Sequence, residues 1–485
     1  MSGVLRDLKP RDVFYYFEEL TKIPHCSGEE ENISNYLVAF ARKNNLEVIQ
    51  DEALNVIIKK KATKGYEDAP TVILQGHMDM VCEKNKDTNH DFSKDPLDLR
   101  IDGDLIKANG TTLGADNGIA VAYTLALLAS NDIDHPALEV LITTEEETGL
   151  VGASKVKKEN LTGKILINID SEEEGILLVS CAGGLRTKIE LPIEWDICDR
   201  NTESYLLSIR GLRGGHSGME INKERGNSNI ILGRILYDLN KELDLSVYEV
   251  SGGAKMNAIP READAKIVLS KDELEIVKSK INKWNDILLN ELKSKDPGIK
   301  VSIEKIKGDA KRIFSKDTLN KLILLYRLIP NGIQSMSMDI EGLVESSTNL
   351  GVVTTYDRKV VFESAARSSV RTLKEEILGR KQALADMVGG NLKKEAEYPE
   401  WQYNPDSYIR EVFIDAYNEK FGEKPKIEAI HAGLECGIFK EKLGDIDMIS
   451  FGPNMYDVHT PDESLSISST ENMWELLKLA LKKIK

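Results

Sequence analysis

Two side chains able to bind a metal ion lie two residues apart at the end of an apolar run. His77 and Asp79 follow residues 72–75, whose composition predicts a buried strand. In an extended chain, residues i and i+2 face the same side, so the imidazole of His77 and the carboxylate of Asp79 lie close together. A carboxylate beside a ligating histidine usually fixes the orientation of its ring. The motif therefore predicts His77 as a metal ligand that Asp79 orients.

Asp116 lies just before a nearly continuous apolar helix predicted over residues 119–129. Its carboxylate could bridge two cations, because each of its oxygens can bind one. Aspartate is also a favoured residue at the start of a helix, so an N-cap is the alternative. The position by itself favours the N-cap.

Three adjacent glutamates, Glu145, Glu146 and Glu147, follow a strand predicted over residues 138–142. Neighbouring carboxylates repel one another, and a cation would stabilise the cluster while leaving one carboxylate free to act as a base. The alternative is a solvated first turn of a helix, where the helix dipole favours negative charge.

Two further potential metal ligands follow predicted strands. Asp170 ends a strand predicted over residues 165–169, and His459 lies just beyond a strand predicted over residues 448–451. Histidine and carboxylate ligands without cysteine are typical of a catalytic zinc or manganese site. Five ligands, one of them bridging, would serve two metals about 3.5–4 Å apart.

A chain of 485 residues is too long for one hydrophobic core, and its elements indicate two domains. Strands alternate with helices over residues 1–185 and again over residues 399–485. This predicts an α/β catalytic domain with a central mixed sheet flanked by helices. Residues 186–398 combine half-buried strands with amphipathic helices and predict an inserted α+β domain. An insertion explains why the ligand-type residues lie at both ends of the chain.

The composition excludes several classes of partner. The chain has 64 Lys+Arg and 80 Asp+Glu, a net charge of −16, which argues against nucleic acid and anionic membranes. The apolar run over residues 119–129 is shorter than the roughly 20 residues that a bilayer span needs. The charged N-terminal residues do not form a signal peptide, so we expect a soluble cytoplasmic protein.

The five cysteines are few, odd in number and widely spaced, and no two form a C-x-x-C pair. They predict neither a disulfide framework nor a thiolate zinc site, and they fit a reducing cytoplasm. They are Cys26, Cys82, Cys181, Cys198 and Cys436.

Taken together, the motifs resemble those of the co-catalytic dinuclear zinc peptidases. This family includes aminoacylase, carboxypeptidase G, carnosinase and bacterial dipeptidases, and the long insertion is similar to that of the dipeptidase branch. The likeness extends over nearly the whole chain. It rests on residues 75–81, 114–118, 168–175, 431–437 and 458–463.

The resemblance implies a role for each ligand-type residue. His77 and Asp170 would hold one metal, Glu147 and His459 the other, and Asp116 would bridge the two. The cofactors implied are two divalent metal ions, zinc in the first place, with manganese or cobalt as alternatives.

The resemblance also implies a catalytic base. The family pattern is two glutamates, one variable residue and a glycine, so counting back from Gly149 makes Glu146 the base and Glu147 the ligand. Two cations lower the pKa of a bridging water to roughly 7, which makes hydroxide available at neutral pH. Glu146 would take the remaining proton during attack on the peptide carbonyl and pass it to the leaving amine.

Five residues of the later motifs are implied in substrate binding. His216 lies in a glycine-rich segment whose spacing matches neither the Walker nor the dinucleotide pattern, and it would donate to the oxyanion. Asn257 and Arg367 correspond to lid contacts, and Arg367 could grip the terminal carboxylate of a substrate through a bidentate pair. His431 and Gly433 would approach the substrate rather than the metals.

The function expected is therefore that of a metal-dependent dipeptidase of broad specificity, including Xaa-His substrates. A large lid that closes over the site would exclude long peptides, and in some relatives it also forms a homodimer interface. The alternative on the same scaffold is an N-acyl-amino-acid amidohydrolase. A metal-binding module without catalysis is the alternative from another class, and it would predict a damaged base or bridge.

Overall fold

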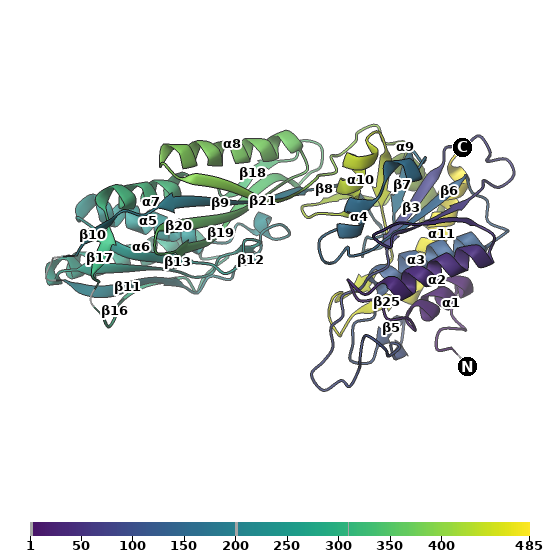
Figure 1. Ribbon diagram of the computed structural model, residues 1–485, viewed down its shortest axis with the longest axis horizontal. Coiled ribbons are helices and arrows are strands. Elements are labelled where there is room, and N and C mark those ends of the chain that lie inside the picture. Colours follow the sequence, from purple (N-terminus) through teal and green to yellow (C-terminus); the bar gives the residue numbers. More distant parts are fainter. Residues whose placement is uncertain (1–2, 199–201, 309) are drawn as a thin grey trace. The chain divides into compact units, whose positions relative to one another are not determined.

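The computed structural model describes residues 3–198, 202–308 and 310–485. These residues form two compact units (Figure 1). Unit 1 comprises the chain up to Ser180 together with Trp401–Ala429 and Leu434–Lys485, and unit 2 comprises Cys181–Glu400 and Ile430–Gly433. The short segment Ile430–Gly433 thus groups with unit 2, although the sequence assigned it to the last part of the catalytic domain.

Unit 1 is built on a mixed sheet of eight strands. Its central strands run parallel, because β6, β3, β7 and β23 pair in the same direction, while β1, β2 and β8 pair antiparallel to their neighbours. The apolar runs predicted as strands are confirmed as β3, β6, β7 and β23. In spatial order the strands are β1 (Glu47–Gln50), β2 (Val56–Lys60), β6 (Leu138–Thr143), β3 (Val72–His77), β7 (Ile165–Asn168), β23 (Asp447–Ser450), β8 (Ile176–Cys181) and β22 (Lys426–Ile430).

Helices flank this sheet, and a small antiparallel sheet of four strands completes unit 1. Figure 1 shows α1, α2 and α3 side by side, and α3 packs on β3. The helices are α1 (Arg11–Leu20), α2 (Glu31–Lys43), α3 (Ala115–Ala129), α4 (Val151–Lys155), α9 (Tyr408–Phe421), α10 (Glu435–Leu443) and α11 (Ile467–Lys483). The small sheet has the order β24 (Met455–Tyr456), β25 (Ser464–Ser466), β5 (Leu105–Ala108) and β4 (Leu99–Asp102).

The two faces of β3 differ in polarity. Val72 and Leu74 belong to the large apolar core shared with the helices α1, α2, α3, α9 and α11. Gln75 and His77 point to the opposite face, because side chains alternate along a strand. On that face Gln75 contacts Glu435, the first residue of α10. One strand therefore combines a packing face with a polar face that ends at the predicted ligand.

Unit 2 is an antiparallel sheet covered by helices, so the predicted α+β fold is confirmed. Helix α8 (Arg371–Met387) runs along β9, β20 and β21 (Figure 1). In spatial order the strands are β16 (Lys300–Lys305), β11 (Glu203–Arg210), β15 (Ala263–Leu269), β13 (Ser246–Gly252), β19 (Val344–Thr355), β20 (Lys359–Ser368), β9 (Gly183–Pro192) and β21 (Asn391–Tyr398), with β18 (Gly332–Met336) paired to β19.

Three further helices and two small strand pairs complete unit 2. The helices α5 (Ser228–Glu242), α6 (Lys271–Leu292) and α7 (Lys316–Leu328) share a second apolar core with the sheet. The small pairs are β10 (Trp195–Ile197) with β17 (Arg312–Phe314) and β12 (Gly215–His216) with β14 (Ala258–Ile259).

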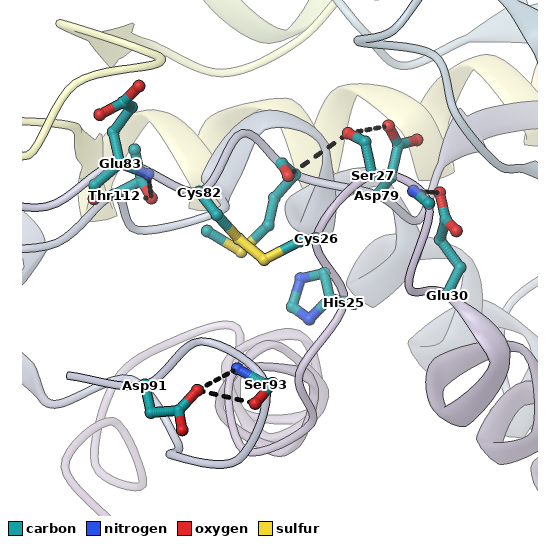
Figure 2. Close-up of a disulfide and its surroundings, with 12 residues drawn as sticks. His25, Cys26, Ser27, Glu30, Asp79, Cys82, Glu83, Asp91, Ser93 and Thr112 are labelled. Carbon is teal, nitrogen blue, oxygen red and sulfur yellow. Dashed lines mark hydrogen bonds between the residues drawn. A yellow bond between two sulfur atoms is a disulfide. The ribbon is translucent and has the colours of Figure 1, made fainter.

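One expectation about the cysteines is wrong. Cys26 and Cys82 form a disulfide across 56 residues of sequence, with their Cα atoms 5.7 Å apart (Figure 2). The two cysteines meet because residue 26 pairs with Met80 in a short parallel bridge just after β3. That pairing is a tertiary contact, which cysteine spacing does not reveal.

Helix α3 is buried along almost its whole length, as its apolar sequence predicted. It packs against α1, and its Tyr123 stacks on Trp474 of α11 with the ring centroids 5.7 Å apart. Among the residues that the structure describes, no helix combines the length and the apolar character that a membrane span requires.

Gly76, the residue before His77, is a first point at which this packing can be tested. An added Cβ would lie 2.4 Å from Asn117 Oδ1 and 2.7 Å from Ala120 Cβ, so we expect Gly76→Ala to reduce the free energy of unfolding by about 1–3 kcal/mol. Gly118→Ala is the matched control, because its Cβ meets only Phe17 at an ordinary 3.4 Å. Urea unfolding of both variants measures the difference. Equal stabilities would contradict the packing argument.

Candidate metal centre

The predicted ligands of unit 1 gather where the parallel strands end. His77 is the last residue of β3, the three glutamates follow β6, and Asp170 follows β7. Parallel strands bring their carboxyl ends to one edge of a sheet, which is where α/β proteins bind ligands. Asp116 lies at the start of α3, and His459 lies in the loop between β24 and β25.

A first cluster consists of His77, Asp116 and Asp170. Their potential ligand atoms all lie within 4.8 Å of one another. His77 Nε2 is 3.1 Å from Asp116 Oδ1 and 3.6 Å from Asp170 Oδ1. These side chains are almost entirely buried, so the two carboxylates converge on one imidazole nitrogen away from water.

A second cluster consists of Asp116, Glu147 and His459. His459 Nε2 is 3.0 Å from the other oxygen of Asp116, Oδ2, and 2.8 Å from Glu147 Oε1. Asp116 therefore directs one oxygen to each histidine. This is the arrangement expected of a carboxylate shared by two cations.

Asp116 is not an N-cap. Gly114 occupies that position, and the backbone of Asp116 and Asn117 is not helical. The side chain of Asn117 connects the end of β3 with the residue after β7. Its Oδ1 accepts from the His77 N–H at 3.1 Å, and its Nδ2 donates to the Ile169 carbonyl at 2.7 Å.

Glu463 holds the loop that carries Asp116, and sequence analysis assigned it no role. Its two oxygens accept the main-chain N–H groups of residues 113–116 at 2.7–3.2 Å. Burial raises the pKa of Glu463 to about 7, although these hydrogen bonds oppose the shift. Glu463 lies in one of the motifs that carried the resemblance, but nothing in the spacing indicated four donors from a segment about 350 residues away.

Two oxygens of Asp79 contact the ring of His77. Nδ1 of His77 is 2.9 Å from the main-chain oxygen of Asp79 and 3.3 Å from its carboxylate Oδ1. A carbonyl oxygen can only accept, so Nδ1 carries the proton and Nε2 is left to face the carboxylates. The Asp79 carboxylate also accepts the main-chain N–H groups of Glu146 at 3.0 Å and Glu147 at 3.3 Å.

The three glutamates do not form a solvated helical turn. They precede α4, which begins at Val151, and the side chain of Glu147 is only 9% exposed. A carboxylate oxygen of Glu146 lies within 4.8 Å of ligand atoms of both His77 and Glu147. Burial raises the pKa of Glu146 to about 9, and the charges of Asp170, Glu435 and Glu147 add to the rise.

His459 and Asp170 of the centre both have raised pKa values. Hydrogen bonds to Asp116 and Glu147 raise the pKa of His459 to about 11. Burial, together with Asp116 and Glu147, raises the pKa of Asp170 to about 6, although His77 opposes the shift. Neighbouring carboxylates thus account for the His459 shift and add to the effect of burial on Asp170, and a cation would favour the ionised carboxylates.

Glu435 adds a further carboxyl to the polar face of the sheet. It is fully buried, and its Oε2 accepts from Gln75 and, at 2.9 Å, from Thr143. Its Oε1 has no hydrogen-bond partner among the described residues. Burial raises the pKa of Glu435 to about 8, and the charge of Asp170 adds to this rise.

The five predicted substrate residues are all in unit 2, and four of them are neighbours. Three of them surround Gly218. A Cβ added at Gly218 would lie 2.7 Å from the carbonyl oxygen of His431, 3.0 Å from Arg367 Nε and 3.1 Å from His216 Cε1. A Cβ on Gly433 would lie 2.7 Å from Tyr398, whose hydroxyl accepts from Arg367 Nη1 at 2.7 Å.

Asn257 lies next to this cluster, because its carbonyl accepts the N–H of Ser217 at 2.9 Å. Burial and the Arg367 charge lower the pKa of His216, and the same causes lower the pKa of His431 to about 4. Arg367 Nε is buried and has no partner among the described residues. The cluster thus contains one cation with an unused donor beside two neutral imidazoles.

Comparison with known proteins identifies the family. Residues 73–483 match the model of peptidase family M20/M25/M40. The chain belongs to this family. Over 480 residues it is 39% identical to the cytosol non-specific dipeptidase of Escherichia coli (strain K12), and the alignment covers 99% of each chain. The resemblance predicted from the motifs is therefore confirmed, as is the prediction of a hydrolase that acts on peptide bonds.

Solved structures of relatives agree with the fold. The crystal structure of aminoacylhistidine dipeptidase from Vibrio alginolyticus matches with a TM-score of 0.95 at 39% identity, covering 99% of this chain and 98% of that one. The crystal structure of aminopeptidase PepT from Bacillus cereus ATCC 10987 matches with a TM-score of 0.57 at 16% identity, covering 98% and 99%. At this low identity, the likeness to PepT shows a shared fold and nothing about function.

The raised pKa of Glu435 predicts that the stability of this M20/M25/M40 family member depends on pH. The folded chain holds the carboxyl proton up to about pH 8, whereas the unfolded chain loses it near the ordinary 4.5, so this group's contribution to stability falls as pH rises through that window. We expect Glu435→Gln to raise the melting temperature of chelator-treated protein at pH 9 by a few degrees and to change it little at pH 5.

The exposed Glu471 of helix α11 supplies the control, and Glu471→Gln should not change the melting temperature in a pH-dependent way. Calorimetric melting at both pH values measures the effect. A Glu435→Gln protein that melts below the unchanged chain at pH 9 would contradict the assignment.

Proposed function

We propose that the chain is a metal-dependent dipeptidase that hydrolyses unblocked dipeptides with broad specificity, including Xaa-His. The observation that carries the proposal is the position of Asp116, with one oxygen 3.1 Å from His77 Nε2 and the other 3.0 Å from His459 Nε2. The relatives of similar length and 39% identity support the substrate class, because both carry the name of a dipeptidase.

Two divalent cations fit the residues of this centre. His77, Asp170 and Asp116 would hold one, and Asp116, Glu147 and His459 the other, with nitrogen and carboxylate donors that suit zinc and also manganese or cobalt. Glu147 Oε1 is buried and lies 2.8 Å from His459 Nε2, and this position beside a second potential ligand supports a ligand role. When bound, the cations supply Lewis acidity that polarises the peptide carbonyl and makes a water acidic.

Glu146 is proposed as the base that moves protons during hydrolysis. Its carboxylate is next to the ligand atoms of His77 and Glu147, and its main-chain N–H is fixed by Asp79. Burial favours the protonated form of Glu146, and neighbouring positive charge favours the ionised form. A carboxyl balanced between these influences can accept a proton from the attacking water and then donate it to the leaving amine.

The cluster in unit 2 is proposed to bind the substrate. Arg367 would pair with the terminal carboxylate, because its Nε is buried without a partner and its Nη1 is fixed by Tyr398. His216 would donate to the developing oxyanion, and Asn257, His431 and Gly433 would contact the substrate backbone. His431 is held by Ser347, whose hydroxyl oxygen is 2.7 Å from Nε2.

The site of action and the assembly are further proposals. The Escherichia coli relative is named for the cytosol, and we propose the same compartment for this protein. A homodimer formed through unit 2 is the proposed assembly. The alternative of an N-acyl-amino-acid amidohydrolase is not favoured, because both relatives with 39% identity are named as dipeptidases.

The roles of the carboxylates can be separated by substitution. Glu146→Ala should retain the metals and lose about 10²–10⁴-fold in turnover, since it removes only the base. Asp116→Ala should lose both metals and turnover, because it removes the shared ligand. Metal content by atomic emission and dipeptide turnover measure the two effects.

Glu145→Ala is the control within the same run of glutamates and should keep metal and turnover. If Glu147→Ala lost turnover while it retained both metals, and Glu146→Ala stayed active, the two assignments would have to be exchanged.

The substrate class is tested with chelator-stripped protein before and after addition of zinc or manganese. We expect restored cleavage of Ala-His and Leu-Gly and no cleavage of a tripeptide or of N-acetyl-methionine. Release of amino acids is measured by chromatography. Cleavage of N-acetyl-methionine alone would support the amidohydrolase instead.

A further inference from the structure

A short segment before α2, residues 25–30, lies against the metal centre without containing any of its ligands. We call it the N-terminal clamp. Its main chain pairs with the residue that follows Asp79, since Met80 donates to the His25 carbonyl at 3.2 Å and Ser27 donates to the Met80 carbonyl at 3.3 Å. Figure 2 shows the clamp with Asp79 on one side and Cys82 on the other.

Ser27 connects the clamp to the catalytic residues. Its hydroxyl donates to Asp79 Oδ2 at 2.7 Å (Figure 2). The same carboxylate lies 3.3 Å from His77 Nδ1 and accepts the main-chain N–H of Glu146 and of Glu147. Asp79 is 1% exposed, so its carboxylate depends on protein donors. A single hydroxyl thus completes the set of donors that fixes the orientation of Asp79.

Glu30 supports the same loop at a second point. It is 3% exposed, and its Oε1 accepts the main-chain N–H of Glu145 at 3.0 Å and that of Gly28 at 2.9 Å. Ser27 and Glu30 therefore hold the strand end that carries Asp79 and the turn that carries Glu146 and Glu147. Both contacts depend on the path of the clamp.

The Cys26–Cys82 disulfide fixes that path. Cys26 precedes Ser27 directly, and Cys82 follows Asp79 by three residues. The covalent bond therefore closes a small loop around the Ser27–Asp79 hydrogen bond. Both cysteines are half-buried rather than fully enclosed.

We propose that Ser27 is a positioning residue for Asp79 and the glutamate turn, and that the Cys26–Cys82 disulfide keeps Ser27 in place, so that turnover and metal affinity depend on the thiol–disulfide state of this pair. The inference rests on the proposed function of the metal centre. Opening the disulfide lets the clamp move, and Asp79 then loses a donor that no other described residue supplies.

The chemistry of the switch requires a reductant of the dithiol class. Its two thiols exchange with the protein disulfide, the Cys26–Cys82 bond breaks, and each cysteine sulfur ends as a thiol with one proton. The dithiol gives up two electrons and two protons and closes to its own disulfide. Oxidation by a disulfide of the same class reverses the step.

The experiment compares oxidised and reduced holoenzyme. Protein is reduced with a phosphine, which takes oxygen from water as it reduces the disulfide, and the reductant is removed without air before assay. The number of thiols titrated in denatured protein should rise by two, which confirms that this pair has opened. Turnover of Ala-His and zinc affinity, by competition with a chromogenic chelator, are then measured.

The expected result is a loss of about 10-fold in kcat or in zinc affinity on reduction, the lower end of what removing a partner of a metal ligand produces. Oxidised Ser27→Ala should show the same loss and little further change on reduction, because both treatments remove one contact. Ser27→Thr keeps a hydroxyl and should restore activity. The Cys26→Ser, Cys82→Ser double variant should behave as reduced protein, whereas Cys198→Ser should respond to reduction like the unchanged chain.

Several outcomes would overturn the inference. One is a fully active reduced protein, and another is normal turnover and zinc affinity in Ser27→Ala. A third is an equal further loss on reduction of Ser27→Ala, which would mean that the disulfide acts through another contact. A fall in melting temperature without any change in kcat or zinc affinity would assign the disulfide a purely structural role.

The zinc measurement separates this inference from the proposed function. Suppose that no dipeptide is cleaved, but that Ser27→Ala and reduction each lower zinc affinity and that reduction of Ser27→Ala lowers it no further. The dipeptidase proposal then fails, and the positioning role stands. If dipeptides are cleaved and neither change has an effect, the reverse holds.

Discussion

Carboxylates that are buried together raise one another's pKa unless positive charge is close, and this electrostatic constraint organises unit 1. Asp170 and Glu146 both have raised pKa values, and His459 is held in its charged form by its carboxylate neighbours. In a protein interior such a group of acids is unfavourable on its own. The centre is therefore built for cations, and its remaining features keep the acids converged.

Hydrogen bonds between side chains and main-chain groups hold the segments that carry these acids in place. Glu463 gathers four N–H groups of the loop before α3, Asn117 joins the ends of β3 and β7, and Asp79 gathers two N–H groups of the glutamate turn. None of these contacts requires an ordinary helix or strand. They use carboxylates and one amide to fix irregular backbone at a strand edge, where a site can reach solvent and substrate.

Unit 2 contains a cluster of its own in which the charge is positive. His216 and His431 are kept neutral by burial and by the Arg367 charge, which leaves Arg367 as the cation of its cluster. A dipeptide has a carboxylate at one end and a carbonyl that becomes negative during attack. In the proposed function, the Arg367 cluster of unit 2 donates hydrogen bonds to negative groups of this kind.

Local sequence determined the elements and the ligand types. The apolar runs at β2, β3, β6 and β7 and the buried helix α3 follow from periodicity and composition, and His77, Asp116 and Asp170 were recognisable because polar ligand-type residues follow apolar elements. These features depend on neighbours in the chain, which a sequence displays directly. The choice of Glu147 rather than Glu146 as a ligand came from a family pattern, since three adjacent glutamates are chemically equivalent on paper.

Only the tertiary structure decided which distant residues meet. The bonds of Glu463 to residues 113–116, the approach of Glu435 to Gln75, and the pairing of Cys26 with Cys82 all join segments far apart in the chain. No periodicity records such contacts, because they arise from the way strands and loops pack. For the same reason the motif of Asp116 by itself favoured an N-cap, whereas the fold places its two oxygens beside two histidines.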